Sequence, residues 1–337
     1  MKNNQAKKRP WIWFVAALIL VIFTIKLPSY YPETHITMRQ KKDYFGVTFS
    51  KKFAEELNMN WKEVYKAILD DLNAKHIRIP VYWEDIEEQE GIFNFEDYDY
   101  IFDEGKKRNV KFVVNIGWRL PRWPECHTPA WLLESDTKTI REKSLTMIKE
   151  VVNRYKTRSE IMYWQVENEP LLKHFGECPS PDYEFLKKEI ELVKSLDDKK
   201  IIISASGELS TWRKEAKVGD VLGITFYRVV WSKYCGFIRY PIPLLYYQLK
   251  ASLWNIPPES RIITELQLEP WTPKGKITDL DQREINKSMS LKQFRSNIQY
   301  AIDLNWKRAY AWGVEWWYWQ KKYGNKNYWN TAKKLFE

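Results

Sequence analysis

Eight short apolar runs alternate with longer amphipathic segments, and this alternation predicts an α/β fold, specifically a closed TIM (β/α)8 barrel. Strands that alternate with helices imply βαβ units and therefore a parallel sheet. The alternation occupies residues 44–337, roughly 290 residues, which is the length of such a barrel. The competing architecture is an open doubly wound sheet. No glycine-rich phosphate loop follows any run, and the chain has only 12 glycines, so the barrel is favoured.

The expected strands are short runs rich in β-branched and aromatic residues. They cover residues 44–49, 76–83, 111–118, 161–166, 200–206, 221–227, 261–266 and 308–314. The expected helices repeat apolar residues at helical spacing. They cover residues 61–75, 95–109, 137–155, 183–196, 244–254 and 291–304, with a shorter polar segment near 211–217 and a last one at 330–336.

The N-terminus is typical of an export signal. Residues 1–10 form a basic flank, and residues 11–27 form an apolar run that is short for a span of about 20 residues. The run begins with Trp11 and Trp13, which suit a membrane interface, and no small-residue cleavage site follows it. We therefore predict a single N-terminal transmembrane signal-anchor helix, and cleavage of the run followed by secretion is the alternative.

In either case the basic flank stays in the cytoplasm and the barrel is exported, because positive flanks remain inside. Residues 28–43 would form a juxtamembrane segment, which leaves a membrane-anchored domain on the extracytoplasmic side. The net charge is +10, and Lys2, Lys7, Lys8 and Arg9 supply four of these charges. The other basic residues are scattered among acidic ones, so no nucleic-acid partner is expected.

The three cysteines fit an exported protein. Cys126 and Cys178 each lie in a proline-containing loop, and an oxidising compartment allows them to form a disulfide, which would leave Cys235 free. A zinc site built from these two cysteines with His127 and His174 is the alternative, although the spacing matches no standard ligand pattern. We expect no metal and no cofactor.

Two acidic residues stand where a barrel carries its catalytic groups, at the carboxyl ends of strands. Glu169 follows the expected strand 161–166, and Glu265 ends the expected strand 261–266. A carboxyl group just past an apolar strand is partly desolvated, which tends to raise its pKa and suits a general acid.

The surrounding motifs resemble those of clan A, the large clan of retaining glycoside hydrolases built on (β/α)8 barrels. Asn168-Glu169-Pro170 is similar to the Asn-Glu-Pro signature at the end of strand four, and Thr264-Glu265-Leu266 to the nucleophile site of strand seven. The resemblance covers about residues 44–320. Residues 77–81 are similar to cellulase-type members, whereas residues 83–87, 91–95 and 127–132 are similar to β-galactosidase-type members, so the exact family stays open.

The resemblance implies a role for each matching residue. Glu265 would attack the anomeric carbon, and Glu169 would act as acid and then as base, which requires carboxyl groups about 5–5.5 Å apart. Asn168 would bind the sugar 2-hydroxyl. Arg78 would keep the nucleophile ionised, and Tyr227 would donate a hydrogen bond to it.

The chain also departs from the cellulase-type pattern. Asn115-Ile-Gly-Trp118 and Thr225 stand where those members carry histidines. Glu269 is a rival nucleophile, but it lies past the strand end and Pro270 follows it. We expect Glu167 to point away from Glu169 and to have a structural role.

Aromatic residues are abundant, with 18 Trp and 20 Tyr, and their flat faces and polar edges suit sugars. Many of them will simply fill a large core. Alternation would place Trp312 and Trp316 on one face, where one of them would form the floor of the catalytic subsite. Trp118 could line a further subsite.

The sequence therefore predicts a monomeric retaining glycosidase that cleaves a β-glycosidic bond in an oligo- or polysaccharide of the cell envelope or the extracellular space. A transglycosylase would use the same pair of carboxyls. The alternatives from other classes are a catalytically silent carbohydrate-binding barrel at the cell surface and a membrane-surface scaffold.

Overall fold

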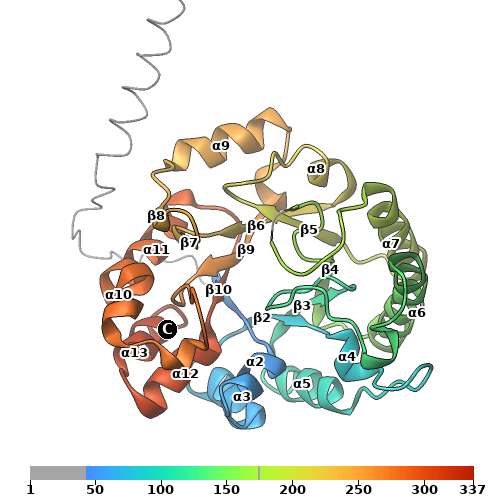
Figure 1. Cartoon of the computed structure of the whole chain (residues 1–337), viewed down its shortest axis with the longest axis horizontal. Coiled ribbons are helices and arrows are strands. Elements are labelled where there is room, and N and C mark those ends of the chain that lie inside the picture. The colour runs from blue at the N-terminus through green and yellow to red at the C-terminus, as the bar shows by residue number, and fades with distance from the viewer. Residues whose placement is uncertain (1–42, 174) are drawn as a thin grey trace, which may run out of the picture.

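The computed structural model describes residues 43–173 and 175–337, and it contains the predicted barrel (Figure 1). Its parallel strands close in the order β1-β10-β9-β6-β5-β4-β3-β2, so neighbours in the chain are neighbours in the sheet. The strands are β1 (Phe45–Thr48), β2 (His76–Pro80), β3 (Lys111–Ile116), β4 (Ile161–Val166), β5 (Ile201–Ser206), β6 (Val221–Phe226), β9 (Arg261–Gln267) and β10 (Ala309–Trp312).

Helices surround the barrel on its outside (Figure 1). They are α2 (Lys51–Glu56), α3 (Trp61–Asp70), α4 (Trp83–Ile86), α5 (Glu96–Lys106), α6 (Thr137–Tyr155), α7 (Tyr183–Leu196), α8 (Glu215–Val218), α9 (Leu244–Leu253), α10 (Gln282–Met289), α11 (Leu291–Leu304), α12 (Val314–Tyr323) and α13 (Asn327–Lys333).

Three helices begin and end at the residues that the sequence predicts, because side-chain caps mark their first turns. Asp136 accepts a hydrogen bond from the Thr139 amide before α6, and Asp182 caps α7 in the same way. Ser290 caps α11 through the Gln293 amide. Each cap satisfies an amide that the first helical turn leaves without a partner.

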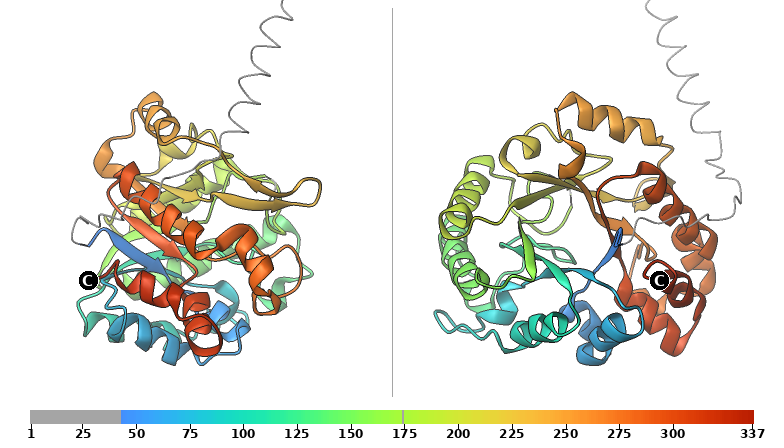
Figure 2. Two further views of the ribbon diagram at one scale, coloured as in Figure 1. Left: turned by 90° about the vertical axis from the view of Figure 1, so that its left-hand side faces the viewer. Right: turned by 180° about the vertical axis from the view of Figure 1, so that it is seen from behind.

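Two elements differ from the expectation. An antiparallel hairpin of β7 (Val229–Ser232) and β8 (Gly236–Arg239) follows β6 and projects from the body (Figure 2). The eighth strand ends at Trp312, not at residue 314, because Gly313 adopts a left-handed conformation at φ 113° and α12 begins directly after it. The expected alternation through Trp316 is therefore wrong, and Trp316 lies on a helix.

The barrel interior has two layers. Val113, Tyr163, Ile202, Val221, Ile262 and Tyr310 form a separate apolar cluster inside it. Two residues further along their strands stand Asn115, Gln165 and Ser204, which are all buried. Since side chains two residues apart share one face of a strand, the apolar layer supports a polar layer nearer the carboxyl ends of the strands.

The predicted anchor, residues 11–27, lies outside the described residues, as do its basic flank 1–10 and residues 28–42. Among residues 43–173 and 175–337, no helix has the length and apolar character that crossing a bilayer requires.

Candidate active site

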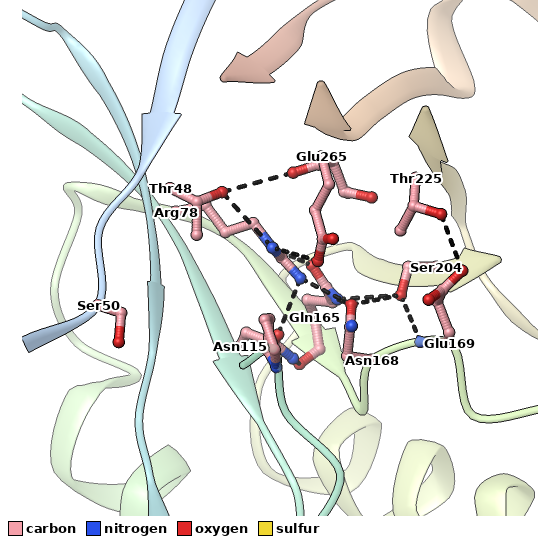
Figure 3. A network of polar contacts seen from close by, with 12 residues as sticks. Thr48, Ser50, Arg78, Asn115, Gln165, Asn168, Glu169, Ser204, Thr225 and Glu265 are labelled. Carbon is pink, nitrogen blue, oxygen red and sulfur yellow. Dashed lines mark hydrogen bonds and ion pairs between the residues drawn. The ribbon is translucent and has the colours of Figure 1, made fainter. Parts of the chain in front are cut away.

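The buried guanidinium of Arg78 organises the polar layer, as Figure 3 shows. Its Nη1 atom lies 3.0 Å from Glu265 Oε1, and its Nη2 atom lies 2.9 Å from Asn168 Oδ1. The Nε atom donates to Gln165 Oε1 at 2.7 Å, and Nη2 also donates to Asn115 Oδ1 at 3.1 Å. A buried cation is stable only with such partners, so the network fixes the position of each acceptor.

Glu265 faces this layer because β9 is irregular beside β6. Ile224 pairs with Ile263, but the next residue of β6, Thr225, pairs with Glu265, so Thr264 is the extra residue of a bulge. Without it, alternation from the interior residue Ile262 would bring Thr264 inward and turn Glu265 away. Gly223 leaves room for the bulge, since a Cβ atom there would lie 2.5 Å from Thr264 Cγ2.

Glu265 is held by two donors on opposite oxygens. Arg78 binds Oε1, and the Tyr227 hydroxyl donates to Oε2 at 3.1 Å. Both oxygens of the side chain therefore have a hydrogen-bond donor, and one donor is a cation. Glu265 is only 4% exposed, which makes this compensation necessary for a buried charge.

Glu169 lies in a contrasting environment. Burial raises its pKa to about 8, and the nearby charge of Glu265 is the second cause. The Thr225 hydroxyl donates to Glu169 Oε1 at 2.8 Å, and the Ser204 hydroxyl accepts from the Glu169 amide at 2.9 Å. Figure 3 shows these contacts beside the Arg78 network. Glu169 is therefore protonated at neutral pH, while Glu265 has a cation as its partner.

Glu167 has the expected structural role, but strand alternation is not the reason, because β4 ends at Val166 and both Glu167 and Glu169 have positive φ angles, 58° and 44°. Its carboxylate accepts hydrogen bonds from the amides of Trp118 and Arg119, at 2.8 and 2.6 Å. Gly117, at φ 131°, permits this approach, because a Cβ atom there would lie 2.4 Å from Glu167 Oε1. Glu167 thus fixes the start of the loop after β3.

That loop, residues 118–127, covers part of the barrel mouth. Arg122 lies between two buried carboxyls, with Nη1 2.5 Å from Glu269 Oε1 and Nη2 3.1 Å from Glu315 Oε2. Its guanidinium stacks on two rings, with its carbon 3.4 Å from the Phe53 centroid and 3.9 Å from the Trp312 centroid. Glu269, the rival nucleophile, is thereby engaged by Arg122.

A third carboxyl from this loop belongs to the same site. Glu125 is buried, and desolvation, followed by the charge of Glu265, raises its pKa well above the usual range. One of its oxygens has no hydrogen-bond partner among the described residues. This oxygen, Oε2, lies 4.0 Å from Arg119 Nε, so Glu125 is a third buried carboxyl near the Glu169–Glu265 pair.

The predicted tryptophans occupy different places. Trp312 reaches the mouth, but Arg122 covers one face of its ring, and the side chain is buried. Trp118 is mostly buried, and its indole donates to Thr128. The prediction for Trp316 is wrong. This residue belongs to α12 and lies in the core, with its ring 4.6 Å from that of Tyr328, so it cannot stack on a sugar.

Several residues of the site were missed by sequence reasoning. Gln165 and Ser204 had a usable signal, because polar residues inside otherwise apolar strands must have buried partners. Thr225 was noticed only as a departure from the cellulase-type pattern, although it shares a strand face with Tyr227. Arg122 and Glu125 had no local signal, since they lie in an irregular loop.

The structure contains the predicted Cys126–Cys178 disulfide, with Cα atoms 5.4 Å apart, and Cys235 is free and exposed. The disulfide joins the loops after β3 and β4. His127 hydrogen-bonds Glu84, and His174 lies outside the described residues. Within the described part of the chain, no cluster of three or more His, Cys, Asp or Glu side chains is placed to hold a metal.

Replacing Cys126 and Cys178 together by serine should destabilise the protein by about 4 kcal/mol, because the bond closes a loop with a sequence separation of 52. For a domain of this size the melting temperature should fall by about 5 °C. Calorimetry of the full chain measures the shift. Cys235→Ser is the matched control and should leave the melting temperature unchanged; an equal drop in both variants would contradict the prediction.

Comparison with known proteins finds one matching family model. The model of glycosyl hydrolase family 10 matches residues 36–181, which include β1 to β4 and Glu169. A comparison with curated proteins finds no match.

Several solved structures share the fold. A cold-adapted β-galactosidase from Rahnella sp. R3 superimposes with a TM-score of 0.60 at 12% identity, covering 88% of this chain and 56% of that one. Xylanase 10B from Thermotoga petrophila RKU-1, in complex with xylobiose, gives a TM-score of 0.55 at 14% identity over 80% of this chain and 81% of that chain. The chain thus spans about half the length of the β-galactosidases that it matches. The family match and the shared barrel confirm the resemblance to clan A glycoside hydrolases.

Proposed function

We propose that this chain is a retaining glycoside hydrolase that cleaves a β-glycosidic bond by double displacement. The contrast between its two carboxyl groups carries the proposal. Glu265 is paired with Arg78 and accepts from Tyr227, whereas Glu169 is buried with a pKa of about 8. One ionised nucleophile beside one protonated acid is the combination that this reaction requires.

In the first step Glu265 forms a bond to the anomeric carbon while Glu169 gives its proton to the leaving oxygen, and the glycosidic bond breaks. In the second step Glu169 takes a proton from water, whose oxygen attacks the same carbon and releases Glu265. Asn168 already accepts from Arg78 through Oδ1, so its amide nitrogen is the group that can donate to a sugar hydroxyl.

Incubation of the full chain with activated 2-fluoro β-glycosides tests the proposal. A sugar-sized mass gain that maps to the peptide containing Glu265 supports it, and the sugar that is accepted narrows the substrate. A label on Glu269 would keep the enzyme class and change the nucleophile. Inverting enzymes form no such adduct, so inversion at the anomeric carbon without a label would contradict the retaining mechanism.

The silent carbohydrate-binding barrel is the second candidate, and the site supports it less well. Arg122 covers one face of Trp312, so a sugar ring cannot stack on that face. Sugar binding alone also does not require the buried pair Glu169 and Glu265. Glycan binding without a label from any 2-fluoro glycoside would favour this candidate.

The proposed location is the extracytoplasmic side of a membrane, held by residues 11–27. The apolar run with its basic flank supports this location, and the disulfide is consistent with an oxidising compartment. The substrate would then be an oligo- or polysaccharide at or near the cell envelope. Protease treatment of intact cells tests the side, and recovery of the chain from the medium would indicate cleavage and secretion.

Replacing Thr225 by valine should move the alkaline limb of the pH profile of kcat/KM upward. Glu169 must be protonated in the first step, so activity should fall as pH rises through about 8. The Thr225 hydroxyl stabilises the charged form of Glu169, and its loss should raise the pKa further, by about one unit.

The measurement is kcat/KM between neutral and alkaline pH. Ser206→Ala, on the adjoining strand β5, is the control, because the Ser206 hydroxyl accepts from the Leu209 amide and contacts neither carboxyl. A limb that stays in place or moves to lower pH in the Thr225 variant would contradict the role of this hydrogen bond.

A further inference from the structure

The solvent-facing side of helix α9 is apolar, which is unusual for a helix on a barrel surface. Leu245, Leu249 and Leu253 are 63%, 60% and 67% exposed, and their spacing of four residues aligns them along one side. The opposite side, with Tyr247, Lys250 and Ala251, is buried against the barrel. The exposed leucines are therefore not needed to attach the helix.

Helix α7 shows what an ordinary outer face looks like in this fold. Its exposed positions are all polar: Glu184, Lys188, Glu191, Lys194 and Ser195. Charged residues normally occupy the solvent side of such a helix, because leucine gains nothing from contact with water. The leucine stripe of α9 thus indicates a surface that is covered by a partner.

The charges around α9 indicate the chemistry of that partner. Residues 221–258 contain no aspartate or glutamate, although the whole chain has 44 acidic residues. Of the four basic residues in this range, Arg228 and Lys250 are buried, whereas Lys233 and Arg239 are exposed on the β7–β8 hairpin. Basic residues without acidic ones, together with exposed leucines, fit an anionic lipid surface.

The position of α9 agrees with a nearby membrane. Gln248 of α9 donates to the Leu304 carbonyl at 2.8 Å, and four residues further on Arg308 donates to the carbonyl of Asp43, the first described residue. Residues 28–42 can reach at most about 50 Å when extended, so an inserted run 11–27 would keep this end of the barrel close to the bilayer. Figures 1 and 2 show α9 at the periphery of the molecule.

We propose that the leucine face of α9 docks on the surface of an anionic membrane and so fixes the orientation of the barrel on it. The helix would lie parallel to the bilayer with Leu245, Leu249 and Leu253 in the interfacial region. The docking does not depend on the proposed glycosidase activity, but it rests on the proposed membrane location.

The test uses the full chain in vesicles of phosphatidylcholine and phosphatidylglycerol that contain a lipid with a nitroxide near its headgroup. In a Cys235→Ser background, a single cysteine replaces Leu249 and carries a bimane fluorophore. The matched control replaces Ile92, which is 63% exposed between α4 and α5. We expect at least about threefold stronger quenching at position 249, because an interfacial helix inserts its apolar face into the headgroup region.

Leu245→Gln with Leu253→Gln in the labelled chain should reduce the quenching at position 249. Leu133→Gln, at an exposed position distant in sequence, should not. Equal quenching at positions 249 and 92 while the chain still sediments with the vesicles would overturn the proposal, since the N-terminal run alone would then hold the protein. Protection of position 249 from iodide without vesicles would also overturn it, because residues of this chain or a second copy would cover the face.

Discussion

Replacing Glu265 by glutamine is expected to lower kcat by about 10⁴- to 10⁶-fold, because an amide cannot form the covalent bond to the anomeric carbon. The substitution keeps the size of the side chain and one acceptor oxygen for Arg78, while its amide nitrogen can donate to the Tyr227 hydroxyl oxygen. The loss should therefore appear in catalysis more than in folding. Initial rates and calorimetry of the same preparation separate the two.

Glu269→Gln is the matched control for this variant. Glu269 is also buried and also paired with an arginine, but its partner is Arg122 and not Arg78. We expect a smaller loss of activity from it, together with a loosened loop 118–127. If Glu269→Gln abolished activity while Glu265→Gln retained it, the assignment of the nucleophile would have to be exchanged.

Replacing Glu169 by alanine should lower kcat/KM by about 10²- to 10⁴-fold for substrates with a poor leaving group. A dinitrophenyl glycoside needs no proton on its leaving oxygen, so its first step should be nearly unaffected and the glycosyl-enzyme should accumulate. Azide, a nucleophile that requires no general base, should restore turnover and give a β-glycosyl azide. The fall in activity near pH 8 should disappear with the carboxyl group.

Glu167→Gln distinguishes this role from a loss of structure. Glu167 is two residues away and equally buried, but it binds the Trp118 and Arg119 amides and no reacting atom. Its replacement should disturb the loop after β3, and azide should not restore the activity. Rescue by azide in the Glu167 variant, or its failure in the Glu169 variant, would show that the acid/base has been assigned wrongly.

The local sequence was sufficient to predict the barrel and to select the two catalytic candidates. Strands β4 and β5 and helices α6, α7 and α11 could be predicted nearly residue by residue, because buried β-branched runs, helical periodicity and capping side chains are local signals. The placement of Glu169 and Glu265 follows from the same signals, since both come at the carboxyl ends of predicted strands. The hairpin β7–β8 and the start of α12 lacked such a signal.

The side to which Glu265 points, and the raised pKa of Glu169, were decided by tertiary structure. Glu265 faces the barrel interior because β9 contains a bulge against β6, and the register of two strands that lie some distance apart in the chain cannot be read from either one. The high pKa of Glu169 results from burial and from the charge of Glu265, a residue far along the chain. In the same way Arg122 meets Trp312, Glu269 and Glu315 only when the closed barrel brings their strands together at one mouth.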